Sequence, residues 1–129
     1  MYVLVVDDDY AIRRLLEVKL AAEGFEVATA EDGHEALLAA GDRPPDLIML
    51  DGMLPGMPGS QVARALRENP ATAGIPILML SALHAEGHVE RAYASGVDDY
   101  VTKPFNLNDV IGRARALIAQ SKAQGAPPE

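Results

Sequence analysis

The sequence predicts a doubly wound α/β fold, in which one parallel five-stranded sheet has helices on both faces. Short apolar runs alternate with segments of helical periodicity throughout the 129 residues. The runs are continuous in their apolar character, which is typical of strands buried on both faces. Buried strands that alternate with helices are joined by crossovers, so the strands lie parallel and the helices cover both faces of the sheet.

The first half of the chain contains three apolar runs and two helical segments. Tyr2–Val6 is rich in β-branched residues and stops at three aspartates, which predicts a buried strand. Ala11–Gly24 has apolar residues on one helix face and ends in a glycine, a typical helix stop. The next elements are expected to be a strand, a short alanine- and leucine-rich helix and a strand, at Phe25–Ala28, Glu35–Ala40 and Asp46–Leu50.

The second half continues the alternation after a loop rich in glycine and proline. Gln61–Glu68 is expected to be a helix, because its apolar residues share one side and Asn-Pro follows it. Ile75–Leu80 is a fourth apolar run and therefore a fourth strand. The last three elements are expected to be a helix, a short strand and an amphipathic helix, at His84–Ser95, Asp99–Thr102 and Leu107–Gln120.

Composition indicates one globular domain, expected at residues 1–120, with residues 121–129 as a flexible tail or the start of a linker. The chain has no cysteine, which excludes disulfides and thiolate metal sites. No apolar run approaches the roughly 20 residues of a membrane span, so we expect a cytoplasmic protein without membrane contact. The net charge of −8 repels phosphate backbones, so direct nucleic acid binding by this chain is not expected.

Charged and hydroxyl residues follow the carboxyl ends of four expected strands. Asp7 and Asp8 follow the first strand, Asp51 the third, Ser81 the fourth and Lys103 the fifth. Ligands of open parallel sheets bind beyond these strand ends, so we expect the side chains to converge. Crowded carboxylates repel one another unless a cation keeps them ionised, and a set of oxygen ligands favours Mg²⁺, with Mn²⁺ or Ca²⁺ behind it.

The same side chains suit phosphoryl chemistry. A carboxylate can attack phosphorus and form an acyl phosphate. Lys103 would then pair with the phosphoryl oxygens, and Ser81 would donate a hydrogen bond to them. Taken singly, each residue also has an ordinary structural explanation, namely a helix cap for the first aspartates or Ser81, a turn for Asp51 and a solvated side chain for Lys103. Asp9, just before the first helix, is expected to be a cap.

Four segments carry a resemblance to a known family. They are VVDDD at the first strand end, DLIMLDGMLPGMPG around Asp51, ILMLSA around Ser81 and GVDDYVTKPF around Lys103. In this order and spacing they resemble bacterial two-component response-regulator receiver domains, of the CheY-like superfamily. The resemblance runs from about Val3 to Leu117 and implies a flavodoxin-like (βα)5 sandwich with strand order 2-1-3-4-5.

The resemblance implies that Asp51 is the phosphoacceptor of a phosphorelay. Asp7 and Asp8 would hold Mg²⁺ together with Asp51 and the backbone carbonyl of Met53, and Mn²⁺ would be a substitute. Lys103 would bind the phosphoryl oxygens. The domain would assist its own phosphorylation and slow dephosphorylation, as a signalling domain and not as an enzyme.

The resemblance also implies a conformational switch. Ser81 stands at the switch hydroxyl position, and the backbone amides of Ala82 and Gly52 are expected to face the phosphoryl group. When Ser81 moves towards that group, Tyr100 turns inward and alters the face formed by the fourth helix, the fifth strand and the fifth helix. The Lys103–Pro104 peptide bond is expected to be cis, which proline permits.

The implied phosphodonor is a sensor histidine kinase or a phosphotransfer protein, and the implied recipient of the signal is an output domain or a target protein. Asp98, Asp99 and Arg113 resemble part of a dimer face on the fourth helix, fifth strand and fifth helix, so a homodimer through that face is a further expectation. Val89, however, stands where a basic residue is expected on the fourth helix, and the chain end lacks the usual paired arginines.

Two variable positions near the site bear on the lifetime of the acyl phosphate. Met53 and Leu83 stand two residues after Asp51 and Ser81. In the family that this chain resembles, the side chains at these two positions influence hydrolysis of the acyl phosphate. Both are apolar and position water poorly, so we hypothesise a long-lived phosphoryl state.

Three other classes of protein share some of these features. Phosphatases of the haloacid dehalogenase type also use strand-end aspartates and Mg²⁺, and Asp7-Asp8-Asp9 contains the Asp-x-Asp spacing that usually follows their first strand. The second acidic element after the third strand, at Asp51, and the short chain argue against this class. A zinc protease helix needs Glu directly after the first His, whereas the segment from His84 to His88 places it one residue late. A pseudo-receiver would lack some of the acids or the lysine, and all are present.

Overall fold

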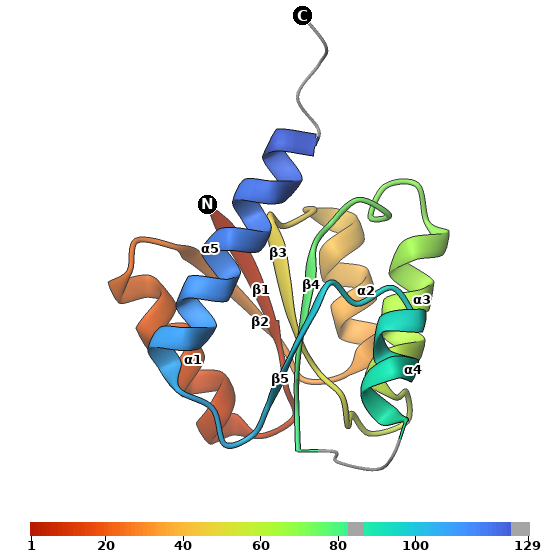
Figure 1. Ribbon diagram of the computed structural model, residues 1–129, viewed down its shortest axis with the longest axis horizontal. Helices are drawn as coiled ribbons and strands as arrows, with labels where there is room; N and C mark the ends of the chain where they lie inside the picture. The colour runs from red at the N-terminus through yellow and green to blue at the C-terminus, as the bar shows by residue number, and fades with distance from the viewer. Residues whose placement is uncertain (83–86, 125–129) are drawn as a thin grey trace, which may run out of the picture.

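A computed structural model of the chain describes residues 1–82 and 87–124. Five strands pair in parallel in the order β2-β1-β3-β4-β5, which confirms the predicted fold and strand order. Figure 1 shows the sheet between α1 and α5 on one side and α2, α3 and α4 on the other. The elements are β1 Tyr2–Val6, α1 Tyr10–Ala22, β2 Glu26–Ala30, α2 Gly33–Asp42, β3 Leu47–Asp51, α3 Gly59–Glu68, β4 Ile77–Ser81, α4 His88–Ala94, β5 Asp99–Thr102 and α5 Leu107–Gln124.

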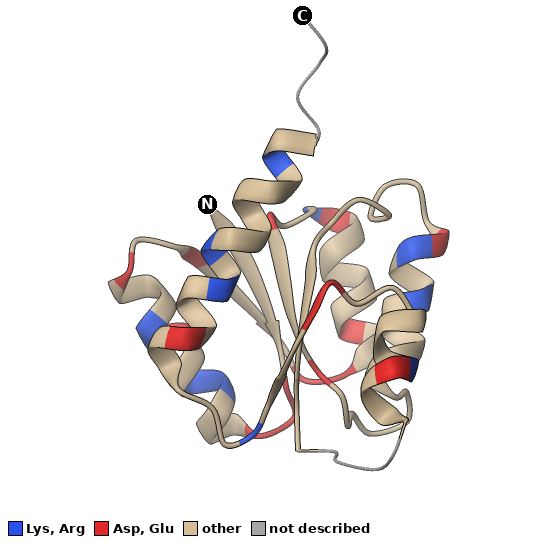
Figure 2. Ribbon diagram, viewed as in Figure 1, with Lys and Arg blue, Asp and Glu red and all other residues tan. Residues whose placement is uncertain are grey.

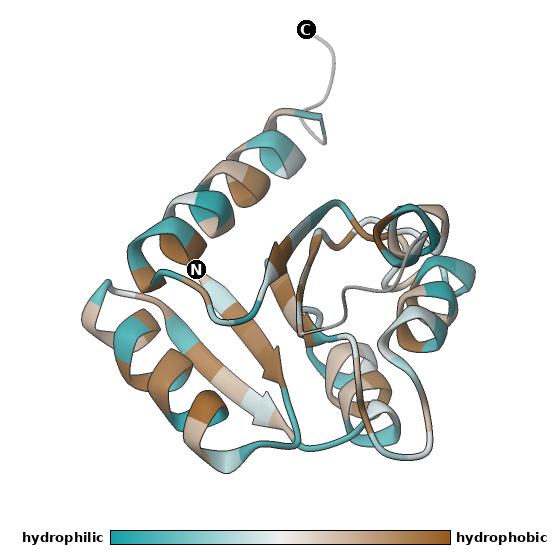
Figure 3. Ribbon diagram, turned by 60° about the horizontal axis from the view of Figure 1, so that its bottom comes forward, coloured by the Kyte–Doolittle hydropathy of each residue, from teal (hydrophilic) through white to brown (hydrophobic). Residues whose placement is uncertain are grey.

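The sheet separates two apolar cores because successive strand residues point to opposite faces. In β1, Leu4 and Val6 pack into the core beneath α2, α3 and α4, whereas Val3 and Val5 pack into the core beneath α1 and α5. Figure 3 shows mostly brown, hydrophobic strands in the middle of the molecule and helices in which brown and teal residues alternate. Each fully buried aliphatic side chain contributes about 1.5–3 kcal/mol, so the central strands anchor the residues at their carboxyl ends.

Helix caps and strand pairing shift several element boundaries from their predicted places. Asp9 caps α1 as predicted, because its side chain accepts hydrogen bonds from two backbone amides of the first turn. Asp32 caps α2 in the same way, so that helix starts before the expected Glu35. The last helix continues past the expected Gln120 to Gln124 and takes in the first residues of the expected tail. Among the residues described, no helix has the length and apolar character needed to cross a membrane.

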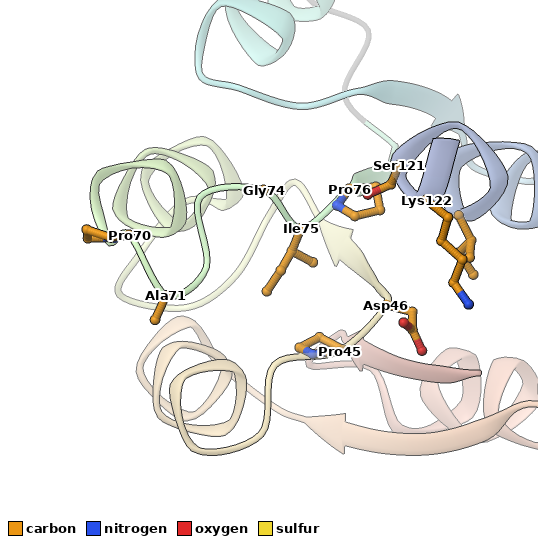
Figure 4. A pocket seen from close by; sticks show the side chains of 10 residues that line it. Pro45, Asp46, Pro70, Ala71, Gly74, Ile75, Pro76, Ser121 and Lys122 are labelled. Atoms are coloured by element: carbon orange, nitrogen blue, oxygen red, sulfur yellow. The ribbon is translucent and has the colours of Figure 1, made fainter. Parts of the chain in front are cut away.

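A hollow of about 340 Å³ lies at the amino-terminal edge of the sheet, opposite the strand ends that carry the predicted site. Figure 4 shows it between the start of β3, the segment before β4 and the end of α5. Its one carboxylate belongs to Asp46, which accepts a hydrogen bond of 2.7 Å from the backbone N–H of Tyr2. The lining of this hollow therefore has no cluster of acids, whereas the predicted acidic residues lie at the opposite edge of the sheet.

Candidate functional site

Three carboxylates converge at the carboxyl edge of the sheet. Asp7 and Asp8 lie in the turn between β1 and α1, and Asp51 is the last residue of β3. One oxygen from each lies within 4.8 Å of the others. Asp7 and Asp51 are buried, with exposed fractions of 2% and 6%, whereas Asp8 is exposed. Figure 2 shows acidic segments gathered at this edge of the molecule.

Lys103 brings a positive charge to the carboxylates from the loop after β5. Its Nζ lies 2.9 Å from Oδ2 of Asp7 and 3.5 Å from Oδ1 of Asp51. Burial lowers the pKa of Lys103, but the hydrogen bond that its ammonium donates to Asp7 and the charges of both aspartates outweigh this effect and raise the pKa above its ordinary value. The ammonium is therefore fully charged at neutral pH. The peptide bond between Lys103 and Pro104 is cis.

These side chains line a cleft of about 340 Å³ that opens to solvent. The residues around it are Asp7, Asp8, Asp9, Ile12, Asp51, Met53, Ala82 and Lys103. Of the predicted site residues, Ser81 and Tyr100 do not line it. Ser81 is fully buried beside Gly52, and a methyl group added to that glycine would lie 2.6 Å from the Ser81 Oγ.

The environment of Asp51 disfavours its charge. Burial and the charge of Asp7 raise the pKa of Asp51 to about 6, although the Met53 N–H and Lys103 act in the opposite direction. The Met53 N–H donates to Oδ1 of Asp51 over 3.1 Å. The three carboxylates offer only oxygen ligands in a solvent-open cleft, which is the donor set that Mg²⁺ prefers. The residues therefore fit a hard divalent cation that would keep Asp51 ionised.

Asp51→Asn is expected to stabilise the protein without added divalent cation at pH 7, by about 1–2 kcal/mol after allowance for solvent in the cleft. The folded-state pKa of about 6 lies above the ordinary value of 3.8, so the folded state holds the Asp51 proton more tightly than the unfolded state. The contribution of the Asp51 carboxyl to the free energy of unfolding is fully present below about pH 4 and is lost as the pH rises through about 6. Urea unfolding at pH 4, 5, 6 and 7 tests this.

In that series, the gain from Asp51→Asn should be largest at pH 7 and absent at pH 4. Mg²⁺ should stabilise the wild type at pH 7 and should stabilise the Asn variant less, because a cation that binds the folded state raises its stability. A gain that is the same at every pH would contradict the assignment of the raised pKa to Asp51.

Tyr100 is already buried, with an exposed fraction of 9%, and packs in the core beneath α4. That the ring turns inward on phosphorylation of Asp51 stays a prediction. The backbone amide of Gly52 differs from expectation. It donates to the carbonyl of Leu80 over 3.3 Å and extends the ladder between β3 and β4, so it does not face the cleft.

Sequence reasoning missed Arg13 and the contact made by His88. Arg13 donates over 2.8 Å to the backbone carbonyl of Asp7 and pairs with Glu31, which ties the turn after β1 to the loop after β2. Arg13 lies one helical turn after Asp9, and this spacing could have predicted that its side chain reaches back to the acidic turn. His88 packs against Tyr100. Leu83, and most of the segment from His84 that was compared with zinc proteases, lie outside the described residues.

The charges expected on a dimer face are paired within the chain. Arg113 contacts both carboxylate oxygens of Asp99 at 3.0 Å and a carboxylate oxygen of Asp109 at 3.0 Å. Asp98 accepts from Arg67 over 2.7 Å and from the backbone N–H of Ile77 over 2.8 Å. Asp98 therefore has a structural role at the edge of β4.

The fold and the acidic cleft define an open parallel α/β domain with a cation-type site at its carboxyl edge. The chain belongs to the response regulator receiver domain family, whose model matches residues 3–115. It is 43% identical over 122 residues to the phosphate regulon transcriptional regulatory protein PhoB of Rhizobium meliloti, an alignment that covers 95% of this chain and 54% of that protein. The chain thus spans about half the length of the curated relatives it matches.

Solved structures agree with this membership. The receiver domain of the Francisella response regulator 1452 superposes with a TM-score of 0.86 at 33% identity, covering 93% of this chain and 98% of that one. The receiver domain of the sensor histidine kinase PA1611 from Pseudomonas aeruginosa, described with a magnesium ion coordinated in its active site cleft, superposes with a TM-score of 0.85 at 27% identity, covering 92% of this chain and 97% of that one. The chain is therefore a receiver domain of two-component signalling, which is a signalling domain.

Proposed function

We propose that Asp51 accepts a phosphoryl group in a Mg²⁺-dependent reaction in the cytoplasm, with a sensor histidine kinase or a phosphotransfer protein as donor. One observation carries the proposal. Oxygens of Asp7, Asp8 and Asp51 lie within 4.8 Å of one another, and the Nζ of Lys103 lies 3.5 Å from Asp51. A nucleophile, cation ligands and a phosphate-pairing ammonium therefore share one cleft.

In the proposed transfer, a carboxylate oxygen of Asp51 attacks the phosphorus of a phosphohistidine. The new O–P bond forms as the N–P bond breaks, and the leaving nitrogen keeps the electron pair and gains a proton from solvent. Lys103 pairs with the phosphoryl oxygens as they move from donor to acceptor. The Met53 N–H donates to Oδ1 of Asp51 over 3.1 Å, whereas no hydrogen bond to Oδ2 is seen among residues 1–82 and 87–124, so Oδ2 is the better placed nucleophile.

Asp7, Asp8, Asp51 and the backbone carbonyl of Met53 would hold Mg²⁺, and Mn²⁺ would substitute. When bound, the cation neutralises the repulsion between the carboxylates and the incoming phosphoryl oxygens. Asp7 also orients Lys103 and the turn after β1. Its Oδ2 pairs with Lys103, and its Oδ1 accepts a hydrogen bond of 2.9 Å from the backbone N–H of Asp9. Asp8, which is exposed in the cleft, is free to bind the cation directly.

Incubation with acetyl phosphate and Mg²⁺ is expected to add one phosphoryl group, seen by intact mass spectrometry. The adduct should be absent with EDTA and in Asp51→Asn, and strongly reduced in Asp8→Asn. Asp46→Asn is a matched control at the opposite edge of the sheet, and it should form the adduct at the wild-type rate. An adduct that persists in Asp51→Asn would remove this residue from its role. No adduct under any condition would favour the pseudo-receiver.

Decay of the adduct tests the proposed slow dephosphorylation. The Met53 side chain is apolar, is 57% exposed and stands at the cleft, so it offers no hydrogen bond to position an attacking water. We expect Met53→Asn to shorten the lifetime of the adduct. An unchanged lifetime would show that this side chain does not limit hydrolysis.

The phosphodonor is proposed to dock beside the cleft. An apolar hollow of about 430 Å³, lined mainly by Ile12, Leu15, Pro104 and Phe105, adjoins the acidic cleft at Lys103. A donor protein bound there would place its phosphohistidine over Asp51. The signal is proposed to leave through the face formed by α4, β5 and α5, where a second copy, an output domain or a target protein would bind.

A further inference from the structure

The ring of His88, the first residue of α4, packs edge-to-face against Tyr100 of β5. The ring centroids are 5.7 Å apart, and the ring planes meet at 73°. Aromatic rings attract one another in this arrangement. Tyr100 lies in the core beside Met79 and Ala92, so His88 covers a ring that is already packed inward. The contact therefore favours the inward position of Tyr100.

The same histidine carries an unfavourable feature. Within residues 1–82 and 87–124, the Nε2 of His88 is the buried side-chain nitrogen or oxygen that finds no hydrogen-bond partner. A buried polar atom without a partner destabilises the conformation that buries it. His88 thus attracts Tyr100 through its ring and weakens the same packing through its nitrogen, which is suited to a contact that has to form and release.

The sheet register connects this contact with the acidic cleft. Tyr100 pairs with Met79, and Thr102 pairs with Ser81, in the ladder between β4 and β5. Alternate residues of a strand share a face, so Ser81 and Tyr100 lie on the same face of the sheet, beneath α4. Ser81 in turn packs against Gly52, the residue after Asp51. Gly52, Ser81 and Tyr100 therefore connect the cleft with His88 through neighbouring residues.

We propose that His88 is the positioning residue for Tyr100, and that its ring sets how strongly the inward conformation of Tyr100 is favoured. This inference rests on the proposed phosphorylation of Asp51, because the inward Tyr100 is the position assigned to the phosphorylated state. Phosphorylation and the inward ring then favour each other reciprocally. A variant that loosens Tyr100 must slow phosphorylation of Asp51, although residue 88 lies outside the lining of the cleft.

Two variants of similar size separate the ring from the nitrogen. H88F keeps an aromatic ring against Tyr100 and removes the unpartnered Nε2, whereas H88L removes both. Initial rates of phosphorylation by acetyl phosphate with Mg²⁺ are expected to equal or exceed the wild type in H88F and to fall by about two- to tenfold in H88L, the worth of one aromatic pair. E90Q changes an exposed residue of the same helix and should match the wild type.

Fluorine NMR of protein labelled with 3-fluorotyrosine reports on the ring directly. The chain has four tyrosines, and Tyr100→Phe assigns the signal of interest. Phosphorylation is expected to move that signal little in the wild type and in H88F, where an aromatic ring at residue 88 holds Tyr100 inward, and further in H88L. A purely structural role for His88 would not make the response to phosphorylation depend on the variant.

H88L phosphorylated at the wild-type rate, or H88F as slow as H88L, would overturn the role of the His88 ring while leaving Asp51 as phosphoacceptor. Absence of an adduct on the wild type would instead contradict the proposed function, and the role of His88 with it. Thermal unfolding of each variant checks that H88L is folded under the assay conditions. If H88L is not folded, the comparison of H88F with the wild type is still valid.

Discussion

Lys103→Met is expected to lower the rate of Asp51 phosphorylation by about 100-fold, the usual effect of removing one preorganised donor from a developing anion. It is also expected to destabilise the metal-free protein by about 2–3 kcal/mol. The Nζ of Lys103 lies 2.9 Å from Oδ2 of Asp7, a carboxylate that is only 2% exposed. Removal of one partner leaves the other as a buried charge without compensation, and the open cleft moderates the cost.

Mg²⁺ should recover much of the lost stability and little of the lost rate. A divalent cation can neutralise Asp7 in place of the ammonium, but it does not supply the second positive charge that pairs with the phosphoryl oxygens. Urea unfolding with and without Mg²⁺, together with adduct formation from acetyl phosphate, measures both effects.

A matched control removes a half-buried surface lysine from an ion pair. Lys19 pairs with Glu23 at 3.1 Å on the surface of α1, and both side chains are about one-third exposed. Lys19→Met is expected to change stability by less than about 1 kcal/mol and to leave phosphorylation unchanged. If Lys103→Met formed the adduct at the rate of this control, Lys103 would serve only to neutralise Asp7.

The convergence of the acidic side chains and Lys103 could be predicted from the sequence because the carboxyl ends of parallel strands meet at one edge of the sheet. Asp7, Asp51 and Lys103 lie far apart in the sequence, but each follows a short apolar run, and the runs could pair only as neighbouring parallel strands. The local pattern therefore also determines the long-range arrangement. The N-cap at Asp9 was predictable for a similar reason, since a cap depends only on the residues that follow it.

Contacts that depend on how loops and helices approach one another were not predictable. The edge-to-face packing of His88 on Tyr100 depends on where α4 begins, and the sequence pattern placed that start at His84. The burial of Tyr100 in the core beneath α4 was not predictable either, because a sequence pattern cannot say which of two ring positions packs better. Gly59 gave no signal beyond its place at the end of a loop rich in glycine and proline, although a Cβ added there would press on the backbone of Asp51.

Gly59→Ala is expected to destabilise the protein by roughly 3 kcal/mol, at the upper end for overpacking. Gly59 begins α3, and its N–H donates to the carbonyl of Gly52 over 3.2 Å. A Cβ at this position would press on the carbonyl oxygen of Asp51 and lie 2.9 Å from the Cα of Gly52. Both neighbours are backbone atoms at the end of a buried strand, so they cannot yield as a flexible side chain would.

Because the added Cβ presses on the backbone of Asp51, the variant should also be phosphorylated more slowly. The loss of rate should exceed what the unfolded fraction of the variant accounts for. Urea unfolding measures the first effect, and the adduct rate at a temperature where the variant is fully folded measures the second. Gly112→Ala is the control, because Gly112 lies inside α5 with nothing within 4 Å of an added Cβ. It should stabilise the protein by about 0.5–1 kcal/mol through helix propensity and leave the rate unchanged.

The comparison separates two uses of glycine in one chain. At Gly112 the missing side chain only weakens a helix, so its addition helps. At Gly59 the missing side chain lets α3 start against the backbone that carries the phosphoacceptor. A Gly59→Ala variant as stable and as rapidly phosphorylated as the wild type would show that the loop from residue 52 to 58 moves aside, and that the position of Asp51 does not depend on this close approach.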